Sequence, residues 1–218
     1  MDAFNASDAK VIFENLINTI HKNSAYLSEV DGAIGDGDHG INMDKGFQNT
    51  KEYLCTDEFD FYAGLDNLGN TLLEIGGAMG PLYGTFFMQM ADVSIRKTCI
   101  DKELFVQMLS NATRAVQNLG GAQLGDKTLL DTLIPANEVF SAAAISGDDF
   151  KQALMKMKKA AEKGKESTRP LIAKVGRASR LGERSRGVLD AGAVSCNLVL
   201  QSLADSIIQL LNNERSIS

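Results

Sequence analysis

The chain has 218 residues, of which 44% are hydrophobic and 23% charged, and its formal net charge is −6. This composition is that of a soluble globular protein long enough to bury a core, and the acidic balance argues against non-specific binding to nucleic acid or membranes. The three cysteines, Cys55, Cys99 and Cys196, are scattered and odd in number, so we expect reduced thiols without a disulfide framework. The N-terminus lacks a signal-peptide pattern, and no stretch approaches the apolar length of a transmembrane helix. We therefore expect a cytoplasmic protein that binds neither nucleic acid nor membranes.

Apolar residues recur at helical spacing along the chain, and the alternation typical of strands is nearly absent. We expect Ser7 to cap a first helix, Pro81 to lie in the first turn of a fourth, and Asp126 to cap a sixth that Pro135 kinks. Gly164 and Pro170 break or only bend a seventh helix. Acidic residues stand where three further helices are expected to begin: Asp101, Asp148 with Asp149, and Asp190.

This pattern predicts about eight helices in one all-α domain that covers residues 1–218, with neighbouring helices antiparallel. Alternate connections of such a bundle fall at the same end. The glycine-rich loops precede the second, fourth, sixth and eighth helices, so we expect them to meet at one end of the bundle.

The most unusual of these loops places Asp31, Asp36 and Asp38 within eight residues and separates them by glycines. Three carboxylates held this close repel one another unless a cation or protons intervene, and oxygen ligands suit Mg²⁺ or Ca²⁺. A solvated acidic turn is the simpler alternative. The stretch does not match a calcium loop of the EF-hand type, because it lacks the third oxygen ligand and the final glutamate of that pattern. Mg²⁺ therefore fits better. His39 follows the aspartates either as a ligand-contacting group or as a residue at the core edge.

Three further stretches have both a functional and a purely structural interpretation. Residues 76–84 are a glycine-rich anion cradle or a site of tight helix packing. Residues 120–128 resemble a phosphate-binding P-loop superficially but fail its pattern, because Asp126 interrupts the required Gly-Lys-Thr and no strand precedes it. A nucleotide site of a different type and a helix cap at Asp126 are the two interpretations, and they can coexist. Residues 174–187 hold five basic residues, either on a solvated surface or as phosphate partners.

Four motifs stand together in the chain: Gly-Asp-Gly-Asp-His-Gly-x-Asn (35–42), Gly-Gly-Ala-x-Gly-Pro-Leu-Tyr-Gly (76–84), Gly-Asp-Lys-Thr-x-x-Asp (125–131) and Gly-Arg-Ala-Ser-x-Leu-Gly-Glu-Arg-Ser (176–185). In this order they resemble the L subunit of bacterial dihydroxyacetone kinase, over nearly the whole chain. The resemblance implies an all-α barrel of eight antiparallel helices that binds ADP or ATP and two Mg²⁺ ions at one end.

Matched position by position, the resemblance implies that Asp31, Asp36 and Asp38 are the Mg²⁺ ligands and that they act in catalysis together with Arg177. It also implies a set of nucleotide-binding residues: His39, Gly40, Ile41, Asn42, Ala78, Met79, Gly120, Leu129, Arg177, Asp190, Ala191 and Gly192. The chain departs from the family pattern twice, because Met79 replaces a usual serine and Ala191 replaces a usual proline.

In the family that these motifs resemble, the keto sugar is bound on a separate K subunit. The resemblance therefore implies a kinase subunit that is catalytically incomplete alone. Its substrate would be dihydroxyacetone or a related ketose such as a tetrulose. Its phosphoryl donor would be either exchangeable ATP or a phosphotransferase-system protein that recharges bound ADP. Two alternatives remain: the nucleotide-binding module of another kinase such as fatty-acid kinase, which the end of this chain at Ser218 argues against, and a non-catalytic regulatory subunit.

Overall fold

The structure is a computed structural model that describes residues 2–55 and 59–215. It is all-α, which confirms the expected fold class. The described residues form eight α-helices: α1 (Lys10–Gly32), α2 (His39–Asn49), α3 (Phe61–Leu73), α4 (Met79–Ser94), α5 (Lys102–Gly120), α6 (Leu130–Ile145), α7 (Phe150–Ser167) and α8 (Ala191–Arg215). Three short 3₁₀ segments cover Ala6–Asp8, Tyr53–Cys55 and Arg177–Ser185.

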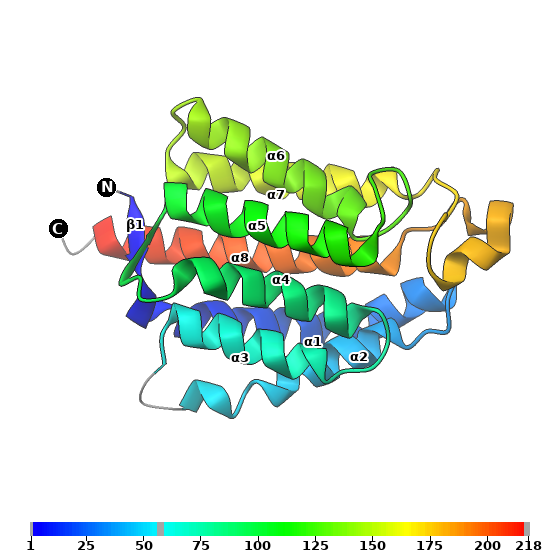
Figure 1. Cartoon of the computed structure of the whole chain (residues 1–218), viewed down its shortest axis with the longest axis horizontal. Helices are drawn as coiled ribbons and strands as arrows, with labels where there is room; N and C mark the ends of the chain where they lie inside the picture. The colour runs from blue at the N-terminus through cyan, green and yellow to red at the C-terminus, as the bar shows by residue number, and fades with distance from the viewer. Residues whose placement is uncertain (1, 56–58, 216–218) are drawn as a thin grey trace.

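The helices run antiparallel along the long axis of the molecule and close into a barrel (Figure 1). Each α-helix packs on the next one in the chain, and α8 returns onto α1. At the end that holds both termini, β1 (Ala3–Asn5) pairs antiparallel with β2 (Cys99–Asp101), with Phe4 opposite Ile100. The loops before α2, α4, α6 and α8 all lie at the other end, which confirms the expectation from alternate connections.

The helix starts at the two ends are capped differently. At the end that holds the termini, Asp60, Asp101 and Asp149 cap α3, α5 and α7, each accepting a hydrogen bond of 2.8 Å from a backbone N–H three residues on. Asp149 also forms a reciprocal capping box with Gln152. At the opposite end, the N-cap residues of α2, α4 and α6 make no side-chain capping hydrogen bond within the described chain. Two of these starts use other acceptors: the Leu130 N–H donates to Thr128 Oγ1 at 3.2 Å, and the His39 N–H donates to Asp31 Oδ2 at 3.4 Å.

Two predicted caps are wrong. Ser7 lies inside the short 3₁₀ segment, and α1 begins only at Lys10, after Ala9. Asp126 lies four residues before the start of α6, where its carboxylate accepts hydrogen bonds from the Gln123 N–H at 2.8 Å and the Lys174 Nζ at 3.0 Å. A carboxylate used in this way holds the loop before α6 together and does not cap the helix.

The expectation that no stretch is apolar enough to span a membrane is also wrong. Ala191–Asn213 of α8, with a mean hydropathy of 1.4, is long and apolar enough to do so by length and composition alone. However, 72% of that window is buried inside the molecule. Its neighbours are α1, α6 and α7, so the apolar character of α8 is that of a core helix. Of the cysteines, Cys99 is exposed and free, Cys196 is buried and free, and the side chain of Cys55 lies outside the described part.

Helices α6 and α7 pack closely where Gly164 of α7 meets the first turn of α6. Pro135 lies inside α6 and has no N–H to donate to the carbonyl of Asp131 four residues earlier. Gly164 packs against this first turn of α6. It lies inside α7, which is continuous and ends before Pro170. A Cβ atom at Gly164 would collide with the Asp131 carbonyl oxygen and lie 2.9 Å from the Thr132 Cα. Neither Gly164 nor Pro170 therefore breaks α7, and Gly164 allows the two helices to approach closely.

The substitution Gly164→Ala is expected to destabilise the protein. The added methyl group meets backbone atoms that cannot move aside, so we expect a loss of about 1–3 kcal/mol, the usual cost of overpacking. Chemical denaturation measures this loss. The matched control is Gly76→Ala, where a Cβ atom meets nothing within 4 Å; equal stabilities of the two variants would contradict the proposed close approach.

Candidate functional site

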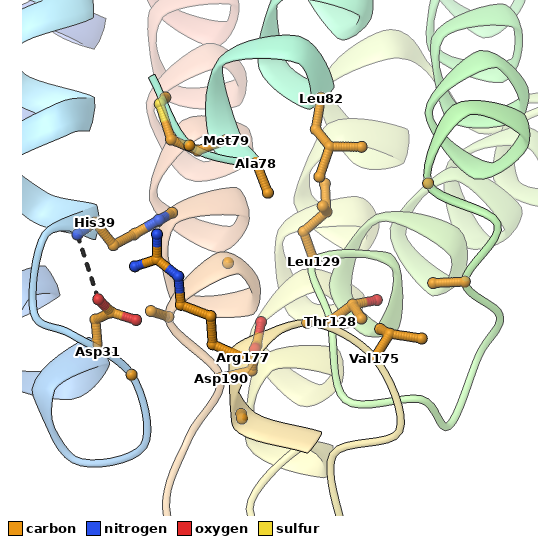
Figure 2. A pocket seen from close by; sticks show the side chains of 18 of the residues that line it. Asp31, His39, Ala78, Met79, Leu82, Thr128, Leu129, Val175, Arg177 and Asp190 are labelled. Carbon is orange, nitrogen blue, oxygen red and sulfur yellow. Dashed lines mark hydrogen bonds between the residues drawn. The ribbon is translucent and has the colours of Figure 1, made fainter. Parts of the chain in front are cut away.

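A cavity of about 520 Å³ opens at the end of the barrel where the four glycine-rich loops meet. All four loops contribute residues to its lining, as Figure 2 shows for representatives of each. Thirteen of the residues predicted from the sequence line it: Asp31, Asp36, Asp38, His39, Asn42, Ala78, Met79, Gly120, Leu129, Arg177, Asp190, Ala191 and Gly192. Residues that lie as far apart in the sequence as 31 and 192 are therefore brought to one volume.

Gly40 and Ile41 are the two predicted site residues that do not line this cavity. Gly40 is buried against α1, where a Cβ atom would collide with the carbonyl oxygen of Ser24. Ile41 faces the solvent and is 66% exposed. The geometry therefore gives Gly40 a packing role, and a nucleotide contact for either residue stays a prediction.

The loop between α1 and α2 gathers the three aspartates. Carboxylate oxygens of Asp31, Asp36 and Asp38 lie within 4.8 Å of one another. Between the last two aspartates, Gly37 has a φ of +76°, a left-handed conformation that glycine adopts without strain. Three hard oxygen donors at this separation fit a divalent cation such as Mg²⁺, which takes few protein carboxylates and completes its coordination with phosphate oxygens and water.

Arg177 reaches the aspartates from the loop between α7 and α8. Its Nη1 forms an ion pair with Asp36 and lies 3.7 Å from Asp38 Oδ2. In Figure 2 the guanidinium points toward Asp31 and His39, across the mouth of the cavity. Because these side chains are about half exposed, the ion pair adds little to stability. Its importance is that it places a planar cation beside the acidic loop.

His39 is held from behind by a buried hydrogen-bond network. Its Nε2 lies 2.8 Å from Ser195 Oγ, which in turn lies 2.7 Å from the hydroxyl of Tyr83. The His39 backbone N–H donates to Asp31 Oδ2 at 3.4 Å, the dashed line in Figure 2. Burial lowers the pKa of His39 to about 4, against a smaller opposing effect of Asp31. The imidazole is therefore neutral near pH 7. His39 lies at the edge of the core and also lines the cavity, so its contact with a ligand stays a prediction.

The cavity receives the N-terminal ends of four helices, because His39, Met79, Leu130 and Ala191 begin α2, α4, α6 and α8 and all line it. Each N-terminus carries a partial positive charge and amide groups without intrahelical acceptors. At α8 the carboxylate of Asp190 accepts the Ala193 N–H at 2.7 Å. The start of α2 directly follows the aspartate loop, and the start of α4 lies within residues 76–84. Backbone amides at such helix starts are suited to bind an anion.

Two charged residues of the lining have displaced pKa values. Burial raises the pKa of Asp190 from 3.8 to about 7, partly opposed by its hydrogen bond to Ala193 and by the nearby ammonium of Lys127. Burial also lowers the pKa of Lys127. A carboxyl group whose pKa is strongly raised inside a cavity is typical of functional sites.

The cavity has an apolar wall that was not predicted from the sequence. Apolar side chains from two helices, α4 and α5, and from the loops before α6 and α8 form this wall: Leu82, Val116, Leu119, Ala122, Leu129 and Val175. Figure 2 shows Leu82 above Leu129 on the side away from the aspartates. Only Leu129 was expected, because apolar residues at helix ends have no sequence pattern that separates them from the core. One side of the cavity is thus acidic and the other apolar.

Comparison with known proteins agrees with this geometry. The family model described as the DAK2 domain matches residues 33–205. A Listeria innocua protein named as the ADP-binding subunit DhaL of PEP-dependent dihydroxyacetone kinase 2 is 38% identical over 204 residues, 90% of this chain and 94% of that protein. The corresponding ADP-binding subunit DhaL of Escherichia coli is 39% identical over 83% of this chain and 87% of its own.

Solved structures give the same fold. A crystal structure of the dihydroxyacetone kinase of C. freundii matches with a TM-score of 0.70 and 24% identity, and one in complex with AMP-PNP and Mg²⁺ matches with a TM-score of 0.66 and 23% identity. Each match covers 93% of this chain and about a third (35% and 34%) of the kinase. Fold and site thus define an all-α barrel with an acidic cavity at one end. The chain belongs to the DAK2 domain family, as a DhaL-type kinase subunit.

The raised pKa of Asp190 predicts a pH dependence of stability. A carboxyl group that holds its proton more tightly when folded stabilises the fold fully below its unfolded pKa of 3.8 and loses this contribution as the pH rises through about 7. We expect Asp190→Asn, which cannot ionise, to gain stability relative to the wild type as the pH rises from about 4 to about 7. Thermal unfolding of the metal-free protein across this range measures the difference.

The comparison between variant and wild type cancels the contribution of His39, whose lowered pKa acts in the opposite direction. The matched control is Asp101→Asn, which removes the carboxylate of a similar helix cap at the other end of the barrel. Parallel curves for wild type and Asp190→Asn throughout the range would refute the assignment.

Proposed function

We propose that this chain binds a magnesium–nucleotide complex in the cavity and acts in phosphoryl transfer to dihydroxyacetone or a related ketose held on a separate K-type subunit. The observation that carries the proposal is the meeting, in one cavity, of three carboxylates with the N-terminal ends of α2 and α4, whose N-cap residues make no side-chain capping hydrogen bond. The first group suits a hard cation and the second suits an anion, so a ligand that satisfies both contains phosphate together with a metal.

Asp31, Asp36 and Asp38 fit the role of metal ligands, since they offer only oxygen and lie within 4.8 Å of one another. We propose that they hold Mg²⁺. The resemblance to the L-subunit family implies two such ions. When bound, Mg²⁺ supplies positive charge that neutralises phosphate oxygens during transfer.

The other parts of the cavity suit the remainder of a nucleotide. The amides at the starts of α2 and α4 and the guanidinium of Arg177 are positioned to offset phosphate charge. Leu82, Leu129 and Val175 form an apolar surface on the other side, suited to a flat base. A cavity of about 520 Å³ lies within the usual range for small-molecule sites. We therefore assign ADP or ATP as the ligand, with the phosphates at the aspartate side.

The partner and the donor follow from the relatives. The DhaL relatives are named as subunits of PEP-dependent or PTS-dependent kinases. We infer that residues 1–218 form one nucleotide-binding domain in the cytoplasm, that a K-type subunit provides the sugar, and that a phosphotransferase-system protein recharges the bound nucleotide. Exchange with free ATP is the alternative donor route. Other relatives, 29–30% identical, are named as erythrulose kinases, so a four-carbon ketose is the second candidate substrate.

The substitution Asp36→Asn tests the metal assignment. It removes one carboxylate charge while it keeps the shape of the side chain. With the K-type subunit present, we expect ketose phosphorylation to fall roughly 100-fold or more, because charge stabilisation of the transferred phosphoryl group is lost. The assay compares dihydroxyacetone with a C4 ketose, and ATP with a phosphotransferase-system donor, so that the same experiment identifies substrate and donor.

A thermal shift separates binding from turnover. Mg²⁺ and ADP at about 100 times their dissociation constant are expected to raise the unfolding temperature of the wild type by roughly 5–10 °C, and that of Asp36→Asn by much less. The control is Asp92→Asn, an exposed aspartate of α4 remote from the cavity, which should behave as the wild type. No transfer by the wild-type pair with any donor would refute the kinase proposal, and undiminished transfer by Asp36→Asn would refute the metal assignment.

A further inference from the structure

The segment that carries Arg177 is a long loop with a narrow neck. We call residues 169–187 the arginine loop; it leaves the barrel between α7 and α8 and extends beyond the end of the helices (Figure 1). Its two ends meet, because the Gly187 N–H donates to the Arg169 carbonyl oxygen at 2.8 Å. Just outside, the Asp190 N–H donates to Thr168 Oγ1 at 3.1 Å. The position of Arg177 thus depends on how firmly this neck is closed.

Lys127 lies directly at the neck. Its side chain is buried, with 1% of the residue exposed, and its Nζ donates to the carbonyl oxygen of Thr168 at 2.7 Å and to that of Val188 at 2.6 Å. Thr168 immediately precedes the arginine loop and Val188 immediately follows it. One ammonium group therefore joins the two chain segments that enter and leave the loop, through charge-assisted hydrogen bonds.

The backbone of Lys127 supports a specific role. Its φ is +64°, in the left-handed region that a residue with a Cβ atom enters at a cost of roughly 1–2 kcal/mol. Such a conformation persists only where its surroundings hold it. The preceding residue, Asp126, holds the arginine loop again: its carbonyl oxygen accepts the Lys174 N–H at 3.1 Å and its carboxylate pairs with Lys174 Nζ at 3.0 Å. Two consecutive residues thus tie the loop at its neck and at Lys174.

The Gly-Asp-Lys-Thr motif does not match a P-loop, and the geometry shows how its lysine is used instead. Two of its three N–H donors are committed to backbone carbonyls, and the side chain is buried. We propose that Lys127 is a positioning residue that closes the neck of the arginine loop and thereby holds Arg177 over the aspartate loop. The consequence for catalysis rests on the proposed function of the cavity, whereas the closure of the neck does not.

The test compares Lys127→Met with a matched control, Lys102→Met. Methionine keeps the length of the side chain and removes the ammonium. Lys102 is a partly buried lysine whose Nζ also donates to a backbone carbonyl, that of Asp148, at 2.7 Å, but at the opposite end of the barrel. Limited trypsin digestion followed by mass spectrometry reads the opening of the arginine loop, which contains five basic cleavage sites, Lys174, Arg177, Arg180, Arg184 and Arg186.

We expect cleavage within residues 174–186 to be about 10-fold faster or more in Lys127→Met, because proteolysis follows the population of the open loop. The dissociation constant for Mg–ADP is expected to rise about 10-fold. Lys102→Met should show neither effect. In an Arg177→Met background, the substitution at Lys127 should change the affinity for Mg–ADP by less than about twofold, since its effect passes through Arg177. A general loss of packing would act equally in both backgrounds.

Unchanged cleavage of the loop in Lys127→Met would overturn the proposal, and so would an affinity loss that persists in full without Arg177. If Lys127→Met fails to fold, Thr168→Val gives the decision, because it removes the second neck hydrogen bond and leaves the lysine in place; loop cleavage must then accelerate over the wild type. Failure of the wild type to bind Mg–ADP would count against the proposed function and leave the digestion result intact.

Discussion

The mutual repulsion of three carboxylates at one end of the barrel is the constraint on which the site depends. Asp31, Asp36 and Asp38 hold their oxygens within 4.8 Å, an arrangement that costs free energy unless positive charge is nearby. The fold supplies that charge in two forms: the N-terminal ends of α2, α4, α6 and α8, and Arg177 from the loop before α8. A metal–phosphate ligand would complete the balance.

Much of this arrangement was predictable from the sequence, for identifiable reasons. Helical spacing of apolar residues and caps such as Asp101 and Asp149 defined the helices. Antiparallel packing then required the loops before alternate helices to share an end, and Figure 1 confirms this. The aspartate cluster is local in sequence, so spacing alone indicated it. Ser7 and Asp126 show the limit of this approach, because a residue suited to capping also serves in turns and loop contacts.

What the sequence did not predict depends on distant contacts. The wall that contains Leu82 and Val175 consists of ordinary apolar residues, which become a wall only where loops converge. The network of His39, Ser195 and Tyr83 joins three helices, and Ile41 faces the solvent although it stands inside a motif. Lys127 is the clearest case: its motif does not match a P-loop, and only the folded structure reveals its bonds to the distant Thr168 and Val188.

If the proposed function is right, the aspartates and the helix N-termini bind one metal–phosphate ligand. The most direct measurement replaces Mg²⁺ with paramagnetic Mn²⁺ in the protein with ADP and records the ³¹P hyperfine coupling by pulsed electron–nuclear double resonance. We expect phosphorus coupling from ADP in the wild type, and its loss when Asp31 and Asp38 are both replaced by asparagine. Bound Mn²⁺ without phosphorus coupling, or coupling that survives this double replacement, would contradict the proposal.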